Sequence, residues 1–172
     1  MVLTVRRVDS RYSCYTLTQR LIMVPDKILA IASAGGHWIE LLRLMPAFEK
    51  SKIVFASTHE SFSESVPGHT YYNVPDASRW NKLRLIYVGL RVAYIILRVR
   101  PHTVISTGAA PGLMGIIVGK FIRSKTIWVD SIANVERISM SGRIALKFTD
   151  KFYTQWPHLA SSKIIYKGNV IA

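Results

Sequence analysis

The chain has 172 residues and a formal net charge of +13, and 49% of its residues are hydrophobic. This length suits one domain with a substantial core, and the hydrophobic content excludes a disordered chain. The charge predicts an anionic neighbour, namely nucleic acid, phospholipid headgroups or a phosphorylated substrate. The single cysteine, Cys14, excludes an internal disulfide framework and a cysteine-rich zinc site, and it suits a reducing compartment.

No apolar run is long enough to cross a bilayer as a helix. The best one, residues 85–97, is interrupted by Arg91, whereas a hydrocarbon core needs about 20 residues of helix. The first 22 residues carry arginines but lack the apolar core of a secretory signal. We expect residues 1–25 to be a poorly ordered extension and residues 26–172 to form a single domain.

From Asp26 onward, short apolar strands alternate with helices. We predict helices at 38–45, 81–99, 112–122 and 142–148, and strands at 27–32, 52–57, 71–74, 103–106, 126–129, 152–155 and 164–166. Pro46 should end or kink the first helix, and Pro101 should stop the second. The alternation predicts an α/β fold with a Rossmann-like, doubly wound parallel sheet.

The loop after the first strand is rich in small residues. Gly35 and Gly36 allow close backbone approach, and the helix that follows points free N–H groups at an anion. His37 faces the positive end of the helix dipole, which disfavours its protonated form and suits a general base. Glu40 could cap the helix, orient the imidazole or contact a bound diphosphate. A tight turn with a capping histidine would give the same pattern.

Two further loops follow strand ends, where ligands bind in open α/β sheets. Thr107 and Gly108 supply a hydroxyl and a glycine before a new helix, and could hold a diphosphate or form a plain connection. Asp130, Asn134 and Glu136 could recognise sugar or phosphate, although a solvated loop would look the same.

The long helix predicted at 81–99 lies in a segment, residues 77–129, that contains no acidic residue. An apolar helix with a narrow stripe of arginine and tyrosine can lie at a membrane interface. The alternative is a crossover helix packed on the sheet with its arginines in water. The predicted membrane-contact residues are Arg84, Tyr87, Arg91, Tyr94 and Arg98.

Nucleic acid competes for the same charge. After Asn81 at its start, this helix lacks the Asn, Gln and Ser side chains that read bases. We therefore expect no nucleic-acid partner. A generic dinucleotide-binding domain is also disfavoured, because the first loop lacks the spaced third glycine of that fingerprint.

Three motifs in order resemble the oligosaccharide-biosynthesis glycosyltransferase subunits. They are Ser33-Ala-Gly-Gly-His37, Thr103-Val-Ile-Ser-Thr-Gly-Ala-Ala-Pro-Gly112 and Trp128-Val-Asp-Ser-Ile-Ala-Asn-Val-Glu-Arg137. That group includes the membrane-anchoring subunit of the two-subunit UDP-N-acetylglucosamine transferase. Residues 27–170 also resemble the N-terminal half of the lipid II-forming N-acetylglucosaminyltransferase, although Val170 stands where that relative has proline.

The resemblance implies the N-terminal, acceptor-binding half of a glycosyltransferase of the B type (GT-B). It implies a separate donor-binding catalytic subunit that holds the UDP-sugar, no tightly bound cofactor or metal, and inversion at the anomeric carbon. It suggests His37 as catalytic base, with Gly35 and Gly36 near the acceptor diphosphate. Thr107, Gly108, Asp130, Asn134 and Glu136 match the second and third loops of the family.

We therefore expect a subunit, inactive alone, of an enzyme that moves a sugar from a UDP-sugar to a polyprenyl-diphosphate-linked saccharide. The sugar would be N-acetylglucosamine, a uronic acid or a hexose, in exopolysaccharide, capsule or oligosaccharide biosynthesis. The expected location is peripheral, at the cytoplasmic face of a bacterial inner membrane. The alternative is a non-catalytic scaffold that recruits the catalytic partner to the membrane.

Overall fold

The computed structural model of the chain describes residues 26–76 and 81–170. The predicted extension at residues 1–25 lies outside the described residues, as do residues 77–80 and 171–172.

One parallel sheet organises the described residues. Its seven strands lie in the order β3-β2-β1-β4-β5-β6-β7, and every neighbouring pair is parallel. This order confirms the Rossmann-like fold predicted from the sequence. The strands are β1 (Lys27–Ile31), β2 (Lys52–Ser57), β3 (Thr70–Asn73), β4 (Thr103–Ser106), β5 (Lys125–Val129), β6 (Lys151–Thr154) and β7 (Ile165–Tyr166).

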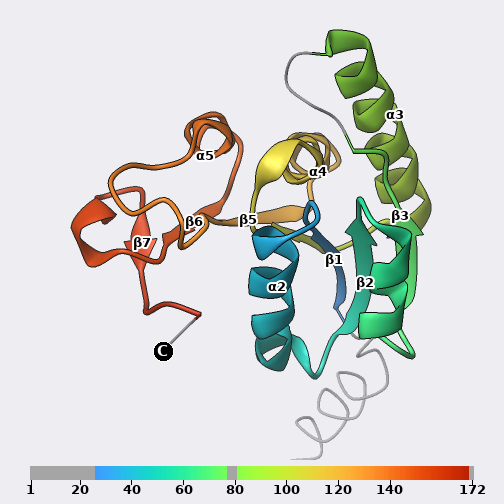
Figure 1. The fold of residues 1–172 in the computed structure, drawn as a ribbon, viewed down its shortest axis with the longest axis horizontal. Coiled ribbons are helices and arrows are strands. Elements are labelled where there is room, and N and C mark those ends of the chain that lie inside the picture. Colours follow the sequence, from blue (N-terminus) through green and yellow to red (C-terminus); the bar gives the residue numbers. More distant parts are fainter. Residues whose placement is uncertain (1–25, 77–80, 171–172) are drawn as a thin grey trace, which may run out of the picture.

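Helices cover both faces of the sheet (Figure 1). Alternate side chains of each strand point to opposite faces, so the sheet has two hydrophobic cores. Leu29 and Ile31 pack with α3 (Lys82–Val99), α4 (Ala109–Phe121) and α5 (Met140–Ala145), while Ile28 and Ala30 pack with α2 (Gly36–Arg43). Three 3₁₀ helices, which we did not predict, complete the described elements: η1 (Met45–Phe48), η2 (Glu60–Ser65) and η3 (Pro157–Leu159).

Most helix boundaries follow local chemistry. Asn81 caps α3, because its side-chain oxygen accepts a hydrogen bond from the Arg84 N–H at 3.0 Å. The predicted start of α4 at Gly112 is wrong, since the helix begins at Ala109. Pro111 is tolerated inside its first turn because the N–H that proline lacks would have no partner there.

Within the described residues, no helix combines the length and the apolar character that crossing a bilayer requires.

Candidate functional site

The strand order reverses at β1 and β4, which lie side by side in the centre of the sheet. From their carboxyl ends the chain leaves for opposite faces, to α2 on one side and to α4 on the other (Figure 1). In open α/β sheets the crevice at such a reversal is where ligands bind. The loops after β1 and β4, both singled out from the sequence, therefore meet at the expected place.

The loop after β1 leaves the start of α2 open. Gly35 is the N-cap and has a left-handed backbone (φ 81), and no side chain caps the helix. The Ala34 N–H donates to Thr58 Oγ1 at 2.9 Å, which anchors the loop to the end of β2. A β-carbon added at Gly36 would meet no atom within 4 Å. Open space therefore lies beside the start of α2.

The loop after β4 has the same design. Gly108 is the N-cap of α4, with φ 145, and again no side chain caps the helix. The Gly108 N–H donates to Ser106 Oγ at 3.1 Å, and Ala109 has a positive φ of 63. Two uncapped helix N-termini therefore begin at adjacent strand ends. Each carries the positive end of a helix dipole, so together they favour an anionic ligand.

His37 lies between these two helix starts. Thr107 Oγ1 donates to the His37 carbonyl oxygen at 2.7 Å, which ties α2 to the end of β4. The imidazole packs against Gly108, where an added β-carbon would come within 2.7 Å of His37 Nδ1. Within the described residues, the Nδ1 atom of His37 is buried and has no hydrogen-bond partner. This is not the case for its Nε2 atom. An imidazole beside two uncapped helix starts has the chemistry that general-base catalysis requires.

Glu40 makes contacts other than those predicted for it. It does not cap α2, and its side chain is only 6% exposed. Its Oε1 accepts hydrogen bonds from Ser131 Oγ at 2.8 Å and from the Ile132 N–H at 3.1 Å. Oε2 is buried and has no partner among the described residues. Glu40 thus joins α2 to the loop after β5.

Asp130 does not fit the predicted ligand contact. The residue is 2% exposed, and its carboxylate accepts four hydrogen bonds from within its own loop and strand. A buried carboxylate with both oxygens so occupied holds the loop together. The donors and distances are Trp128 Nε1 (3.0 Å), Ser139 Oγ (2.6 Å), Ser139 N (3.0 Å) and Asn134 Nδ2 (3.2 Å).

Asn134 and Glu136 lie further along the same loop. Asn134 is half-buried, and its side-chain amide is the one that donates to Asp130. Glu136 is exposed. The structure therefore brings Gly35, Gly36, His37, Thr107 and Gly108 together, whereas Glu40, Asp130 and Asn134 support the loops around them.

Sequence reasoning missed several supporting residues. Thr58 anchors the first loop, Ser106 the second and Ser131 holds Glu40. Their only signal in the sequence is a hydroxyl side chain directly at or after a predicted strand end, a pattern that is common in loops. Each becomes recognisable only when the strands are placed side by side.

The outward face of α3 is apolar. Large side chains recur along it at spacings of three and four residues, opposite the buried Val88, Val92 and Val99. Such a row is unusual on a surface in contact only with water. The exposed side chains of this outward row are Leu83, Ile86, Tyr87, Leu90, Tyr94 and Leu97.

The predicted arginine stripe runs beside this outward row. Arg84 and Arg98 are exposed, and Arg91 is half-buried with its guanidinium 5.6 Å from the centre of the Tyr94 ring. The sequence therefore identified the cations and tyrosines of this face but not its leucines and isoleucine. Those residues looked the same as the buried ones until the packing side of the helix was known.

The last described residues pack beside the candidate site. The Gln155 side chain donates to the Asp130 carbonyl oxygen at 3.1 Å and accepts from the Val170 N–H at 3.0 Å. Arg43 donates to the Val170 carbonyl oxygen at 3.1 Å. A cavity of about 330 Å³ lies there, between η1, the α2 face of the sheet and residues 167–170. The end of the described chain is thus tied to the loop after β5.

Comparison with known proteins gives one family match and several curated relatives. The family described as "Oligosaccharide biosynthesis protein Alg14 like" matches residues 77–170. The UDP-N-acetylglucosamine transferase subunit alg14 of Schizosaccharomyces pombe is 40% identical over 165 residues, covering 78% of this chain and 77% of the relative. The subunit ALG14 of Homo sapiens is 28% identical over 183 residues, covering 84% and 82%.

Solved structures with the same fold are far less similar in sequence. Acinetobacter baumannii MurG matches with a TM-score of 0.68 at 9% identity, over 84% of this chain and 46% of that structure. UDP-N-acetylglucosamine 2-epimerase from Rickettsia bellii matches with a TM-score of 0.65 at 14% identity, over 86% and 46%. The chain thus spans a little under half the length of these structures.

Proposed function

Since this chain belongs to the Alg14 family of oligosaccharide-biosynthesis proteins, we propose that it is the acceptor-binding subunit of a two-chain UDP-N-acetylglucosamine transferase. Its acceptor would be a saccharide linked to a polyprenyl diphosphate. The observation that carries the proposal is the position of His37 between two uncapped helix N-termini.

The diphosphate of the acceptor would bind at the starts of α2 and α4. The two dipoles supply positive potential there, and the uncapped first turns supply N–H donors. Gly36 supports this assignment. Its backbone is not left-handed and the space around it is open, so the fold itself does not require a glycine at this position. A ligand that approaches the backbone closely would require one.

His37 would act as the general base. Its Nε2 would remove the proton from the acceptor hydroxyl as that oxygen attacks the anomeric carbon of the donor sugar. The bond from the anomeric carbon to the diphosphate of UDP would break, and UDP would leave with inversion at that carbon. Gly108 and Thr107 position the base, since one packs against the ring and the other holds its backbone.

The donor would bind to a second chain. The curated relatives are named as subunits of a UDP-N-acetylglucosamine transferase, which supports a second subunit in the enzyme. We propose that the partner chain holds the UDP-sugar and that this subunit has no tightly bound cofactor of its own. Alone, it would have no transferase activity.

We propose that the outward row of α3 contacts the membrane. Aliphatic and tyrosine side chains would enter the headgroup region, and the adjacent arginines would meet anionic lipid. The lipid-linked acceptor resides in that membrane, so the contact would hold the site near its substrate. We propose a peripheral location at the cytoplasmic face of the membrane. As predicted from the sequence, that membrane would be a bacterial inner membrane.

The decisive experiment measures transfer by the chain co-purified with its donor-binding partner. His37→Ala should reduce kcat by about 100-fold or more, as expected on loss of a general base, with little change in affinity for the partner. His69→Ala is the matched control, because that residue lies just before the amino end of the edge strand β3, whereas the candidate site lies at the carboxyl ends of the central strands β1 and β4. Unchanged turnover of His37→Ala would instead favour the non-catalytic scaffold.

A further inference from the structure

Two arginines have a backbone conformation that glycine normally takes. Three described non-glycine residues have positive φ, and one of them, Ala109, belongs to the candidate site. The other two are Arg100 (φ 48), directly after α3, and Arg123 (φ 64), just after α4. Both line one cavity of about 430 Å³ at the amino-terminal end of β4, whereas the candidate site lies at the carboxyl end of that strand. We refer to it as the arginine cavity; it is lined by Leu97, Arg100, Pro101, His102, Ile122, Arg123 and Ser124.

Helix termination alone does not account for these arginines. Glycine is the usual residue after a helix C-terminus, because it adopts the left-handed conformation without strain. A basic side chain can interact with the negative end of the dipole from the last helical turn, without that strain. Arg98 and Lys120 already occupy the last turns of α3 and α4. Arg100 and Arg123 therefore add a second basic side chain at the end of each helix, at positions where glycine would be unstrained.

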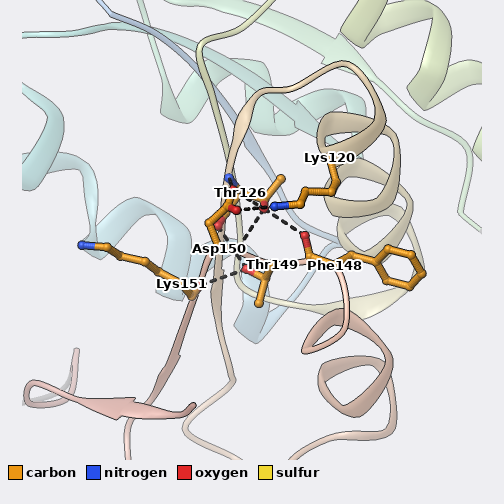
Figure 2. A network of polar contacts seen from close by, with 6 residues as sticks. All are labelled: Lys120, Thr126, Phe148, Thr149, Asp150 and Lys151. Atoms are coloured by element: carbon orange, nitrogen blue, oxygen red, sulfur yellow. Dashed lines mark hydrogen bonds and ion pairs between the residues drawn. The ribbon is translucent and has the colours of Figure 1, made fainter. Parts of the chain in front are cut away.

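The two guanidinium groups have no acidic partner within the part of the chain that the structure describes. Asp150 lines a neighbouring cavity together with Arg123. Figure 2 shows that this carboxylate is already engaged by Lys120 and by the Thr126 N–H and hydroxyl, the latter two at 2.9 Å. The arginine cavity thus has unbalanced positive charge.

His102 adds a neutral donor. The Lys27 N–H donates to His102 Nδ1 at 3.3 Å, so the neutral ring carries its proton on Nε2. The Ser124 hydroxyl donates to the Pro101 carbonyl oxygen at 2.6 Å and is already used. Two guanidinium groups and one imidazole N–H, with no carboxylate among the lining residues, match the acceptor oxygens of a phosphate group.

The surroundings of the cavity indicate the source of that phosphate. Leu97 lines the cavity and is also the last residue of the outward row, with 59% of its side chain exposed. Phe121, two residues before Arg123, is 77% exposed. Apolar side chains beside a phosphate site fit a phospholipid, whose headgroup and acyl chains are joined in one molecule.

We propose that the arginine cavity binds the headgroup phosphate of an anionic phospholipid, with Leu97 and Phe121 against its acyl chains. This inference rests on the membrane contact proposed for α3. As the crossover from β3 to β4, α3 runs from the carboxyl edge of the sheet to its amino edge, a length of about 27 Å. A headgroup bound at the far end would hold the whole helix along the membrane, with the candidate site at its near end.

The test compares vesicle binding by the full chain and by Arg100→Gly/Arg123→Gly. Glycine suits both left-handed positions, so the variant should fold at least as stably as the wild type. Its affinity for phosphatidylglycerol vesicles should fall by about 30-fold, and its weak affinity for phosphatidylcholine vesicles should not change. Lys50→Gln/Lys163→Gln is the control, because it removes the same charge at exposed positions outside the cavity.

Three outcomes would overturn the inference, each in a different way. If the variant and the control lost the same affinity for phosphatidylglycerol vesicles, only the net charge of the protein would determine vesicle binding. If the wild-type chain did not bind phosphatidylglycerol vesicles, the proposed membrane contact of α3 would be wrong, and so would the lipid site that rests on it. Inorganic phosphate at low millimolar concentration that binds the wild type but not the glycine variant, and that leaves vesicle binding by the wild type unchanged, would assign the cavity to free phosphate. None of these outcomes bears on the His37 test.

Discussion

The imidazole of His37 lies directly against Gly108, so that a β-carbon on that glycine would come within 2.5 Å of His37 Cε1. The two residues are far apart in the sequence and belong to loops on adjacent strands. Gly108 also has φ 145, a backbone conformation open in practice only to glycine. The same residue therefore shapes the turn and makes room for the candidate base.

Gly108→Ala should move His37 and strain the turn at once. We expect the free energy of unfolding to fall by about 2 kcal/mol and kcat of the co-purified complex to fall at least tenfold. Gly68→Ala separates the two effects, because Gly68 is also left-handed (φ 81) but has no atom within 4 Å of an added β-carbon. It should lose stability and keep activity. Denaturant unfolding and transfer assays check both, and full activity of Gly108→Ala would contradict the placement of His37.

Gly36→Ala should impair acceptor binding without lowering the stability of the fold. The added methyl group meets open space and the position is helical, so stability should be unchanged or should rise by up to about 1 kcal/mol. If the acceptor diphosphate approaches this backbone, KM for the acceptor should rise about tenfold, which corresponds to ~1.4 kcal/mol. An unchanged KM would mean that the ligand does not contact the start of α2.

Asp130→Asn should behave as a structural change. The side-chain amide would present a donor to groups that already donate to the buried carboxylate, so we expect a loss of about 3 kcal/mol in the free energy of unfolding. Glu136→Gln, at an exposed position in the same loop, should change stability by less than about 0.5 kcal/mol. A fully stable Asp130→Asn protein with a raised KM for the acceptor would restore Asp130 as a ligand contact.

Asp150 predicts a pH dependence of stability. Burial alone would raise the pKa of its carboxyl group, but hydrogen bonds from Lys120 and Thr126, with the charge of Lys120, outweigh burial and leave that pKa below its ordinary value. The folded protein therefore binds this proton less readily than the unfolded chain. The stabilisation is complete above the unfolded pKa and is lost as the pH falls through the folded one.

Between pH 5 and pH 3, the wild type should consequently lose more stability than Asp150→Asn, which has no proton to take up at this position. Chemical unfolding across that range measures the difference. Parallel curves for the two proteins would show that the Lys120–Asp150 pair contributes nothing to the acid sensitivity.

Ile86→Glu/Leu90→Glu should release the protein from membranes without unfolding it. Both side chains are exposed in the outward row of α3, so stability should change by less than about 0.5 kcal/mol for each. Vesicle co-sedimentation should fall by at least tenfold, because two apolar contacts become anionic next to anionic lipid. Sedimentation equal to that of the wild type would assign this face to something other than a membrane.

The sequence alone determined the strand–helix order, and with it the parallel sheet and the two loops of the candidate site. Those signals are local: an apolar run followed by glycine and a helix start, as at Gly35 and Gly108, has the same meaning in any α/β protein. The arginines and tyrosines of α3 were also visible, since their spacing along a helix is set by its geometry alone.

Only the tertiary structure decided which polar residues face the site and which apolar ones face outward. Asp130 and Glu40 looked like ligand contacts until the fold placed their partners beside them, Ser139 from the same loop as Asp130 and Ser131 from a segment far from Glu40 in the chain. Leu90 and Val92 cannot be told apart by composition, because burial depends on which side of α3 meets the sheet. Hydrogen bonds and burial between segments remote in the chain are properties of the assembled fold, and no local pattern encodes them.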